Sequence, residues 1–415
     1  MSRLENNNKI AIIGGGQTAI YAAKEIREHD QNCLITIYSE ENEIPYEKPP
    51  LSKQYLKGEK NFEDIIFFSK EFLIEKKIDI KTNSKIKFID LIKRELETED
   101  DIKYSYDKLL IANGAINKKI DIEELKNDKD ILYLRNIKEC ELLKSKINCS
   151  KNILIIGGGF IGLEVASSIK SKNNNVNIIE IGKNLMGRII PKKISDIVLN
   201  IHKNRGNKIF LSTSIEKVVK KDKHYEILLS NKEKLKVDLI IVGIGSIPNT
   251  DIYLNTELKI NNGIETNNFC ETSVENVYAA GDISNFYHSF FKKNLRLESY
   301  THAQNHGICA GKNIAGVKTM YEDIPWMWSD QFEYNIQLTG ICDDFDTIYE
   351  RGTDQDEGLI FFFIKNDLIQ GACGIGKVGK IGRDIKLASR ILSKKIKVNQ
   401  KEIEDKNFKL NKLLR

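Results

Sequence analysis

Short apolar runs recur along the chain and alternate with longer stretches in which apolar residues have helical spacing. The runs at Ile10–Ile13, Ile153–Ile156 and Leu239–Gly245 have the length and β-branched character of buried strands. The stretches Ile20–Ile26 and Leu163–Ile169, which follow the first two runs, have the pattern of helices. Strands that alternate with helices in this way predict an α/β fold with parallel sheets.

The pattern changes near Asp323, where shorter alternating segments replace the strand–helix repeat. Segments with the alternation of strands are Ile336–Thr339, Thr347–Tyr349 and Leu359–Ile364. A final helix is indicated by apolar residues at helical spacing, namely Ile381, Ile385, Ala388 and Leu392. The C-terminal part therefore predicts a separate α+β domain.

A glycine-rich turn follows the strand and opens the helix at two places in the chain. The first turn contains Gly14, Gly16 and Ala19, and the second contains Gly157, Gly159 and Gly162. Such a turn presents backbone N–H groups and a helix N-terminus to a pyrophosphate. One such motif is weak evidence, but two on one chain predict two dinucleotide sites.

Each glycine turn is accompanied by an acid at the end of the next strand. Glu40 follows the strand that starts at Leu34, and Glu180 follows the strand that starts at Val176. The offset of roughly twenty residues is the one at which an acid accepts the ribose hydroxyls of an adenosine. Because a carboxylate repels a 2′-phosphate, Glu180 favours NADH over NADPH, although Lys183 lies close by.

The first domain is not complete when the second glycine turn begins. A buried strand from Lys108 ends in the turn Ala112–Gly114, and a later strand from Val274 delivers Asp282 at a glycine turn. An aspartate at that point suits the ribityl or phosphate part of a flavin. We therefore expect two Rossmann-like domains of the glutathione-reductase type, a discontinuous one at 1–114 and 248–322 and an inserted one at 115–247, followed by an α+β domain at 323–415.

Composition narrows the class of protein. Of the 415 residues, 41% are hydrophobic and 30% are charged, and the net charge is only +5, so nothing indicates a nucleic-acid-binding protein. No apolar run approaches the length of a membrane span. The segment Met1–Lys9 lacks the apolar core of a signal peptide, so we expect a cytoplasmic protein without a membrane partner.

The cysteines and histidines do not form a recognisable reactive or metal-binding motif. The seven cysteines are scattered, and no two have CxxC spacing, which disfavours a flavin disulfide reductase. His302 and His306 have the i, i+4 spacing of a helical metal pair, but no third ligand lies near them in the sequence. We therefore expect no metal site.

Four further motifs identify a family. They are Pro45–Lys53, Ala279–Asp282, Glu298–Gly307 and Pro325–Gln331, the last of which joins both tryptophans of the chain to a polar triplet. With these motifs the chain resembles, over nearly all its length, the FAD-dependent NADH:ferredoxin reductases that serve Rieske dioxygenases and bacterial cytochromes P450. This is the group of putidaredoxin reductase and biphenyl dioxygenase reductase. The apoptosis-inducing-factor-like oxidoreductases share part of the pattern.

The resemblance implies a role for each motif residue. It implies that FAD is held by Gly14, Gly16, Ala19, Glu40, Ala112 and Asp282, with Lys48, Lys53 and Trp328 on the flavin side. It implies that NADH is held by Gly157, Gly159, Gly162 and Glu180. It also implies that Glu164 pairs with Lys53 close to flavin N5, so that Lys53, Glu164 and Trp328 are the residues nearest the chemistry. A cation at that place would stabilise the reduced, anionic flavin.

The implied activity is electron transfer. A flavoprotein of this kind takes a hydride from NADH onto FAD and passes single electrons to a [2Fe–2S] ferredoxin that feeds an oxygenase. Two alternatives stay open, an NADH oxidase or reductase of quinones or other small acceptors, and a redox-responsive interaction protein of the apoptosis-inducing-factor type. The sequence leaves the oligomeric state open.

Overall fold

The computed structural model describes residues 8–170, 173–187 and 189–415. Residues 1–7, which belong to the segment without a signal-peptide pattern, lie outside the described residues. The chain forms two compact units. Unit 1 consists of Met1–Glu47, Phe62–Ile116 and Ser246–Asp323, and unit 2 consists of Lys48–Asn61, Asn117–Gly245 and Ile324–Arg415. The expected division into three domains, with breaks at 114/115, 247/248 and 322/323, stays a prediction.

Unit 1 is built on a five-stranded parallel sheet with the strand order β19-β7-β1-β2-β3. The strands are β1 (Lys9–Ile13), β2 (Leu34–Tyr38), β3 (Ile78–Lys81), β7 (Lys108–Ile111) and β19 (Val277–Ala279). Alternate residues of β1 enter two different cores, with Ile10 and Ile12 on one face and Ala11 and Ile13 on the other. The strand is apolar throughout because both faces of a parallel sheet are covered.

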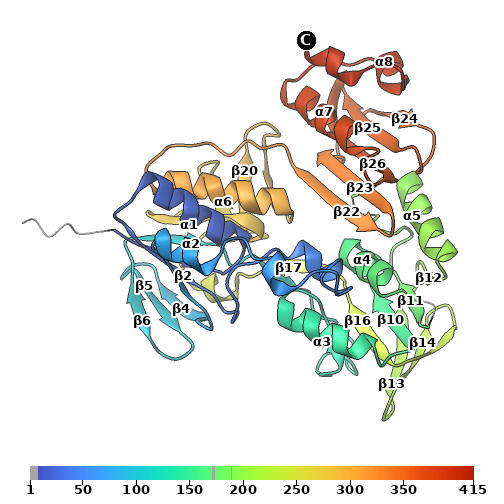
Figure 1. Cartoon of the computed structure of the whole chain (residues 1–415), viewed down its shortest axis with the longest axis horizontal. Helices are drawn as coiled ribbons and strands as arrows, with labels where there is room; N and C mark the ends of the chain where they lie inside the picture. Colours follow the sequence, from blue (N-terminus) through green and yellow to red (C-terminus); the bar gives the residue numbers. More distant parts are fainter. Residues whose placement is uncertain (1–7, 171–172, 188) are drawn as a thin grey trace, which may run out of the picture. The chain divides into compact units, whose positions relative to one another are not determined.

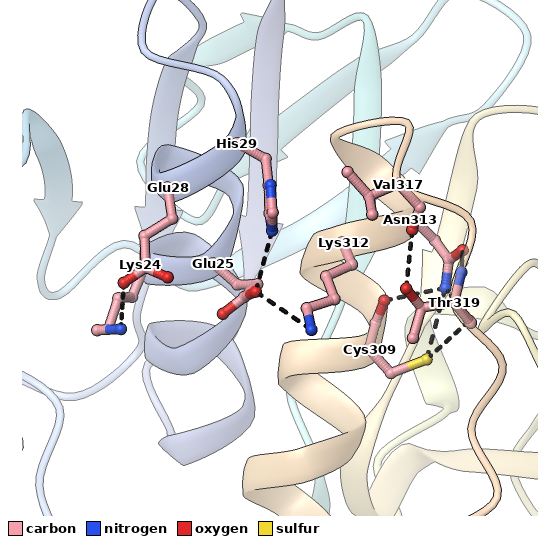
Figure 2. Close-up of polar contacts among 9 residues, drawn as sticks. All are labelled: Lys24, Glu25, Glu28, His29, Cys309, Lys312, Asn313, Val317 and Thr319. Carbon is pink, nitrogen blue, oxygen red and sulfur yellow. Dashed lines mark hydrogen bonds and ion pairs between the residues drawn. The ribbon is translucent and has the colours of Figure 1, made fainter.

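The helices α1 (Gln17–His29) and α6 (Tyr300–Ile314) lie side by side in unit 1 (Figure 1). Gly307 and Gly311 of α6 make this close approach possible. A Cβ on Gly311, for example, would lie 2.6 Å from the carbonyl oxygen of Ala22 in α1. Figure 2 shows Glu25 of α1 between His29 and Lys312, with an ion-pair distance of 3.6 Å to the Lys312 Nζ of α6. Segments far apart in the sequence thus form one helical layer.

Smaller elements complete unit 1. The helix α2 (Lys70–Glu75) precedes β3. One antiparallel sheet contains β4 (Ile86–Asp90), β5 (Glu95–Thr98) and β6 (Lys103–Ser105). A further sheet contains β18 (Ile264–Thr266), β20 (Ser284–His288) and β21 (Lys293–Leu295). The strands β8 (Ala115–Asn117) and β17 (Ser246–Pro248) lie where the chain passes from one unit to the other.

Unit 2 contains a second five-stranded parallel sheet, in the order β12-β11-β10-β16-β9. Its strands are β9 (Ile131–Leu132), β10 (Asn152–Ile156), β11 (Asn175–Ile179), β12 (Lys208–Phe210) and β16 (Leu239–Val242). The helices α3 (Ile137–Ile147), α4 (Phe160–Ile169) and α5 (Lys192–Asn204) accompany it, with the antiparallel strands β13 (Ile215–Lys220), β14 (Tyr225–Leu229) and β15 (Lys234–Val237). The strand and helix patterns at Ile153 and Leu163 are confirmed.

The C-terminal part of unit 2 is an antiparallel sheet in the order β22-β23-β26-β25-β24. Its strands are β22 (Trp326–Gln331), β23 (Tyr334–Gly340), β24 (Thr347–Gly352), β25 (Leu359–Lys365) and β26 (Leu368–Lys377). The helix α7 (Gly382–Ser393) packs on β23 and β26, and α8 (Gln400–Glu404) packs on β24. The predicted strands and the predicted final helix are therefore confirmed.

The short segment Lys48–Asn61 belongs to unit 2 although unit 1 precedes and follows it in the sequence. Its 3₁₀ turn at Pro49–Ser52 is held by α3 and α4. The Cys140 thiol of α3 lies 3.2 Å from the Leu51 carbonyl oxygen, and the Ser168 hydroxyl of α4 donates to the Ser52 carbonyl oxygen at 2.7 Å. These bonds fix the backbone immediately before Lys53.

No α-helix within the described part of the chain has the length and apolar character that crossing a bilayer requires.

Candidate functional site

The first glycine turn connects β1 to α1 in unit 1. Gly14 has a positive φ of 111°, and a Cβ there would lie 2.4 Å from the Ala112 carbonyl oxygen, so only glycine fits this close approach. Gly16 is the N-cap of α1 and has no atom within 4 Å of an added Cβ. No side-chain hydrogen bond caps α1, so the N–H groups of its first turn are available to a phosphate.

The other predicted FAD residues of unit 1 follow strands of the same parallel sheet. Glu40 is exposed beyond the end of β2, Ala112 is buried directly after β7, and Asp282 is half-buried in the turn after β19. Ala19 is fully buried in α1. Because the carboxyl ends of parallel strands share one edge, the sheet brings these residues to the same edge as the glycine turn.

The second glycine turn, between β10 and α4 in unit 2, repeats this geometry. Gly157 has a φ of 108°, and a Cβ there would lie 2.4 Å from the Gly243 carbonyl oxygen. A Cβ on Gly162 would lie 2.3 Å from the Gly157 carbonyl oxygen, so the helix packs tightly on the turn. Gly159 is the N-cap of α4, and no side chain caps this helix either. The turn fits a second pyrophosphate.

The Glu180 carboxylate is held beside the second glycine turn by two backbone amides. One carboxylate oxygen accepts the Gly158 N–H at 2.7 Å, and the other accepts the Gly182 N–H at 2.7 Å. The side chain is half-buried at the end of β11, whereas Lys183 is exposed. A fixed negative charge at this strand end disfavours a 2′-phosphate.

Lys53 and Glu164, which lie on remote segments of the sequence, form a buried ion pair in unit 2. Lys53 Nζ lies 2.8 Å from Glu164 Oε2, and the two residues are 8% and 2% exposed. Glu164 also accepts hydrogen bonds from Ser52 Oγ at 2.5 Å and from Ser329 Oγ at 2.7 Å. A carboxylate with three donors is well satisfied in a dry environment, and it keeps the lysine in one position.

The strand β22 places the two tryptophans and Asp330 on one face and the buried Ser329 and Gln331 on the other. Trp326 and Trp328 stack with ring centroids 5.2 Å apart and an interplanar angle of 24°. Lys53 Nζ lies 5.9 Å from the Trp328 ring centroid, and the indole N–H of Trp328 donates to Asp330 at 3.3 Å. Both rings are half-exposed. Ser329 faces the other way and is fully buried against Glu164.

The remaining predicted residue, Lys48, is half-buried at the N-cap of the 3₁₀ turn that leads to Lys53. The sequence interpretation missed Ser52 and Ser329 as partners of Glu164. Both lie inside motifs that carry the family resemblance, and the only signal in the sequence was their position, Ser52 next to Lys53 and Ser329 next to Trp328. The distances alone could assign them to one carboxylate.

The histidine pair of α6 has partners other than a metal. Nδ1 of His302 and the Tyr321 hydroxyl are 2.9 Å apart, and the Gly281 N–H donates to Nδ1 of His306 at 3.1 Å. Burial lowers the pKa of both imidazoles, that of His302 to about 3, so they pack as neutral rings. Within the described residues no group of three metal ligands occurs.

Family models match almost the whole chain. The model described as pyridine nucleotide-disulphide oxidoreductase matches residues 8–307, and the model described as reductase C-terminal matches residues 326–414. The first match spans both glycine turns, and the second spans the sheet that carries Trp328 and Ser329.

Individual relatives cover nearly the full length. The chain is 30% identical over 404 residues to the rhodocoxin reductase of Rhodococcus erythropolis, covering 97% of this chain and 93% of the relative. It is also 30% identical to the 3-phenylpropionate/cinnamic acid dioxygenase ferredoxin–NAD(+) reductase component of Photorhabdus laumondii, covering 93% and 96%. A crystal structure of the ferredoxin reductase for the CYP199A2 system from Rhodopseudomonas palustris has a TM-score of 0.92 and 27% identity, covering 98% and 99%.

Proposed function

The chain belongs to the pyridine nucleotide-disulphide oxidoreductase family, and on that premise we propose that it is an NADH-dependent ferredoxin reductase. It takes a hydride from NADH onto FAD and passes single electrons to a [2Fe–2S] ferredoxin that feeds a Rieske dioxygenase or a cytochrome P450. The names of the two relatives, a rhodocoxin reductase and a ferredoxin–NAD(+) reductase component, support this activity. The family's disulphide chemistry is not proposed, because no two cysteines have CxxC spacing.

The observation that carries the proposal is the pair of uncapped helix N-termini, α1 in unit 1 and α4 in unit 2. Each follows a glycine turn that fits a pyrophosphate, and each has an acid at the end of the neighbouring strand. A chain with two such sites can hold an electron donor and a prosthetic group at the same time. We assign the site of unit 1 to FAD and the site of unit 2 to NADH.

The residues of the proposed sites bind and orient. When bound, FAD supplies two-electron acceptance and one-electron release, which no side chain can provide. Gly14, Gly16 and the first turn of α1 bind one pyrophosphate, and Gly157, Gly159 and the first turn of α4 bind the other. Glu180 accepts the ribose hydroxyls of NADH and excludes NADPH. No protein nucleophile is required.

We assign Lys53, Glu164 and Trp328 to the flavin chemistry, following the family resemblance. The buried carboxylate of Glu164 pairs with Lys53 and holds it in one position, and a fixed cation favours negative charge on a reduced flavin. Trp328 limits access of water, and Lys48 is a second basic residue on the flavin side. The proposal places the FAD domain at 1–114 and 248–322, the NADH domain at 115–247, and the reaction in the cytoplasm.

The test is steady-state reduction of cytochrome c by the FAD-loaded protein with NADH, with and without a dioxygenase-type [2Fe–2S] ferredoxin. Strong dependence on the ferredoxin is expected, because the ferredoxin then carries the electrons. If NADH reduces the flavin but the ferredoxin adds nothing, and dioxygen or a quinone is turned over instead, the protein is an oxidase or small-acceptor reductase. A change of oligomeric state with NADH, without efficient turnover, would favour a redox-responsive interaction protein.

A further inference from the structure

Glu164 is the end of a longer chain of hydrogen bonds that runs through the buried interior of unit 2. Ser329 Oγ lies 2.7 Å from Glu164 Oε1, and Gln331 Nε2 lies 2.9 Å from Ser329 Oγ. Gln331 Oε1 lies 3.0 Å from His202 Nε2, and His202 Nδ1 lies 2.9 Å from Asn207 Nδ2. The chain therefore connects α4, β22 and α5.

Every member of this hydrogen-bond chain is withdrawn from water. Glu164 and Asn207 are 2% and 3% exposed, and Ser329, Gln331 and His202 are fully buried. An unpaired polar group at such a position would cost about 1–3 kcal/mol. The five side chains thus form a single network that depends on partners inside the protein; of their polar atoms only Asn207 Oδ1, at the far end, is buried without a hydrogen-bond partner among the described residues.

The chemistry of the carboxylate fixes the direction of each bond. A carboxylate only accepts, so Ser329 has to donate its proton to Glu164. The Ser329 oxygen then accepts from the Gln331 amide, and the Gln331 carbonyl oxygen is left to accept from His202. All donors in this row therefore point toward Glu164.

The same logic determines the state of His202. Its Nε2 has to carry the proton, and its Nδ1 has to accept from the Asn207 amide, so the ring is neutral with a single tautomer. Burial lowers the pKa of His202 to about 4, against the opposing effect of the hydrogen bond to Gln331. The neutral form demanded by the hydrogen bonds is also the form that burial favours.

We propose that Ser329, Gln331 and His202 are positioning residues for Glu164, acting as a one-way hydrogen-bond chain whose direction is set by the Glu164 carboxylate. The chain holds the carboxylate in the orientation in which its other oxygen meets Lys53 and Ser52. This role in catalysis rests on the proposed function, whereas the direction of the chain does not.

The direction is tested by imidazole nitrogen NMR of the FAD-loaded, [15N]histidine-labelled protein near neutral pH, with His202→Phe to assign the signal. We expect the wild-type His202 to be protonated at Nε2. In Glu164→Gln, Lys53 and Ser52 continue to donate to the side-chain oxygen, so the new NH₂ group faces Ser329 and donates. Each following bond then reverses, and His202 becomes predominantly protonated at Nδ1.

The matched control is Glu141→Gln. Glu141 lies in the same unit and accepts a hydrogen bond from the Tyr55 hydroxyl, but it is not a member of the hydrogen-bond chain from Glu164 to Asn207. The His202 signal is expected to stay as in the wild type. Ser329→Ala removes a link of the hydrogen-bond chain. In this background, the His202 tautomer should therefore be the same with glutamate or glutamine at position 164. The proposal is overturned if His202 of the wild type is protonated at Nδ1. It is also overturned if His202 stays mainly protonated at Nε2 in Glu164→Gln, or if Glu141→Gln changes the tautomer as much as Glu164→Gln does.

The positioning role is tested separately by the rate constant of flavin reduction by NADH in Ser329→Ala. The loss of one of three donors to a charged group predicts a fall of about tenfold or more, with the dissociation constant of NADH unchanged. Ser195→Ala, which alters a buried serine of α5, is the control and leaves the rate unchanged. If Ser329→Ala reduces its flavin with NADH as fast as Ser195→Ala does, Ser329 has no positioning role. If the wild type binds no flavin, the proposed function fails, and the tautomer is still read in the flavin-free protein.

Discussion

At the scale of single residues, the buried carboxylate of Glu164 depends most strongly on its hydrogen-bond and ion-pair partners. A carboxylate that is 2% exposed is stable only because Lys53, Ser52 and Ser329 all donate to it. Removing one partner leaves a charge that water cannot reach. Effects on stability and on the proposed chemistry therefore have to be separated when this site is altered.

Lys53→Met is expected to lower the free energy of unfolding by about 3 kcal/mol, because it leaves Glu164 without a cation in a dry site. The double variant Lys53→Met/Glu164→Gln should recover most of this loss, since no buried charge remains, but not the rate of flavin reduction. Calorimetric unfolding and stopped-flow reduction by NADH measure the two effects. Lys232→Met, which breaks an exposed pair with Glu216, is the control, and equal destabilisation in both lysine variants would contradict the argument.

Glu180→Ala is expected to weaken discrimination between the two nicotinamide cofactors. Without the carboxylate that Gly158 and Gly182 hold in place, the ribose of NADH loses its acceptor and a 2′-phosphate is no longer repelled. The ratio of kcat/KM for NADPH to that for NADH should rise by about tenfold or more. Lys183→Ala, which keeps the carboxylate, should retain the NADH preference; a preference that survives in Glu180→Ala would speak against this assignment.

At the scale of elements, the packing of α1 on α6 depends on the absence of side chains. A Cβ on Gly307 would lie 2.4 Å from the Thr18 carbonyl oxygen, and one on Gly311 would lie 2.6 Å from that of Ala22. Figure 2 shows the same pair of helices joined further along by Glu25 and Lys312. The helix that follows the first glycine turn is thus held by a partner almost three hundred residues later in the chain.

Gly311→Ala is expected to lower the melting temperature, although alanine is the better helix former by about 1 kcal/mol. The clash with the backbone of α1 cannot be relieved by a rotamer change, and overpacking of this kind costs about 1–3 kcal/mol. Ser145→Ala, at an exposed position of α3, is the control, because it raises helix propensity without a clash between helices and loses only the hydrogen bond from the Ser145 hydroxyl to the Leu142 carbonyl oxygen. A rise of the melting temperature in Gly311→Ala would show that α1 and α6 can move apart enough to accommodate the added methyl group, and would contradict this prediction.

At the scale of the whole molecule, four of the six histidines are buried, namely His202, His288, His302 and His306. Burial lowers the pKa of each, to about 4 for His202 and about 3 for His302. The unfolded chain therefore binds protons on these rings at a higher pH than the folded protein does. Their contribution to stability is complete above the unfolded value of about 6.5 and is lost as the pH falls toward the folded values.

We expect unfolding near pH 5.5 to take up close to one proton for each of His202, His302 and His306, because burial holds their folded pKa values well below the unfolded value and carboxylates contribute little at this pH. For His202 the shift corresponds to about 3 kcal/mol of stability lost between neutral pH and about pH 4. Calorimetry in two buffers of different ionisation enthalpy measures the uptake. His302→Phe should reduce it by about one proton relative to the wild type. An unchanged proton uptake in His302→Phe would be inconsistent with this account.

The predictions from sequence succeeded where the signal is local. The turn at Gly14 joins a strand and a helix that are adjacent in the chain, so composition and spacing were sufficient to predict β1 and α1. The motif Pro325–Gln331 was recognised from the family resemblance, which gave a role to Trp328 but none to Ser329 or Gln331. That Trp328 and Ser329 point to opposite faces follows from the alternation of a strand, but which face is buried depends on what β22 packs against.

By itself, the sequence determined an α/β fold with two dinucleotide turns, an acid beside each turn, and a C-terminal α+β part, because strands, glycine turns and helix starts are specified by neighbouring residues. The tertiary structure alone decided that the segment around Lys53 packs with α3 and α4, and that Glu164 accepts from residues 111 and 165 positions away. It also decided the link through Gln331 to His202, 129 positions apart. Hydrogen bonds need partners within about 3 Å, and only the packing of distant segments sets such distances.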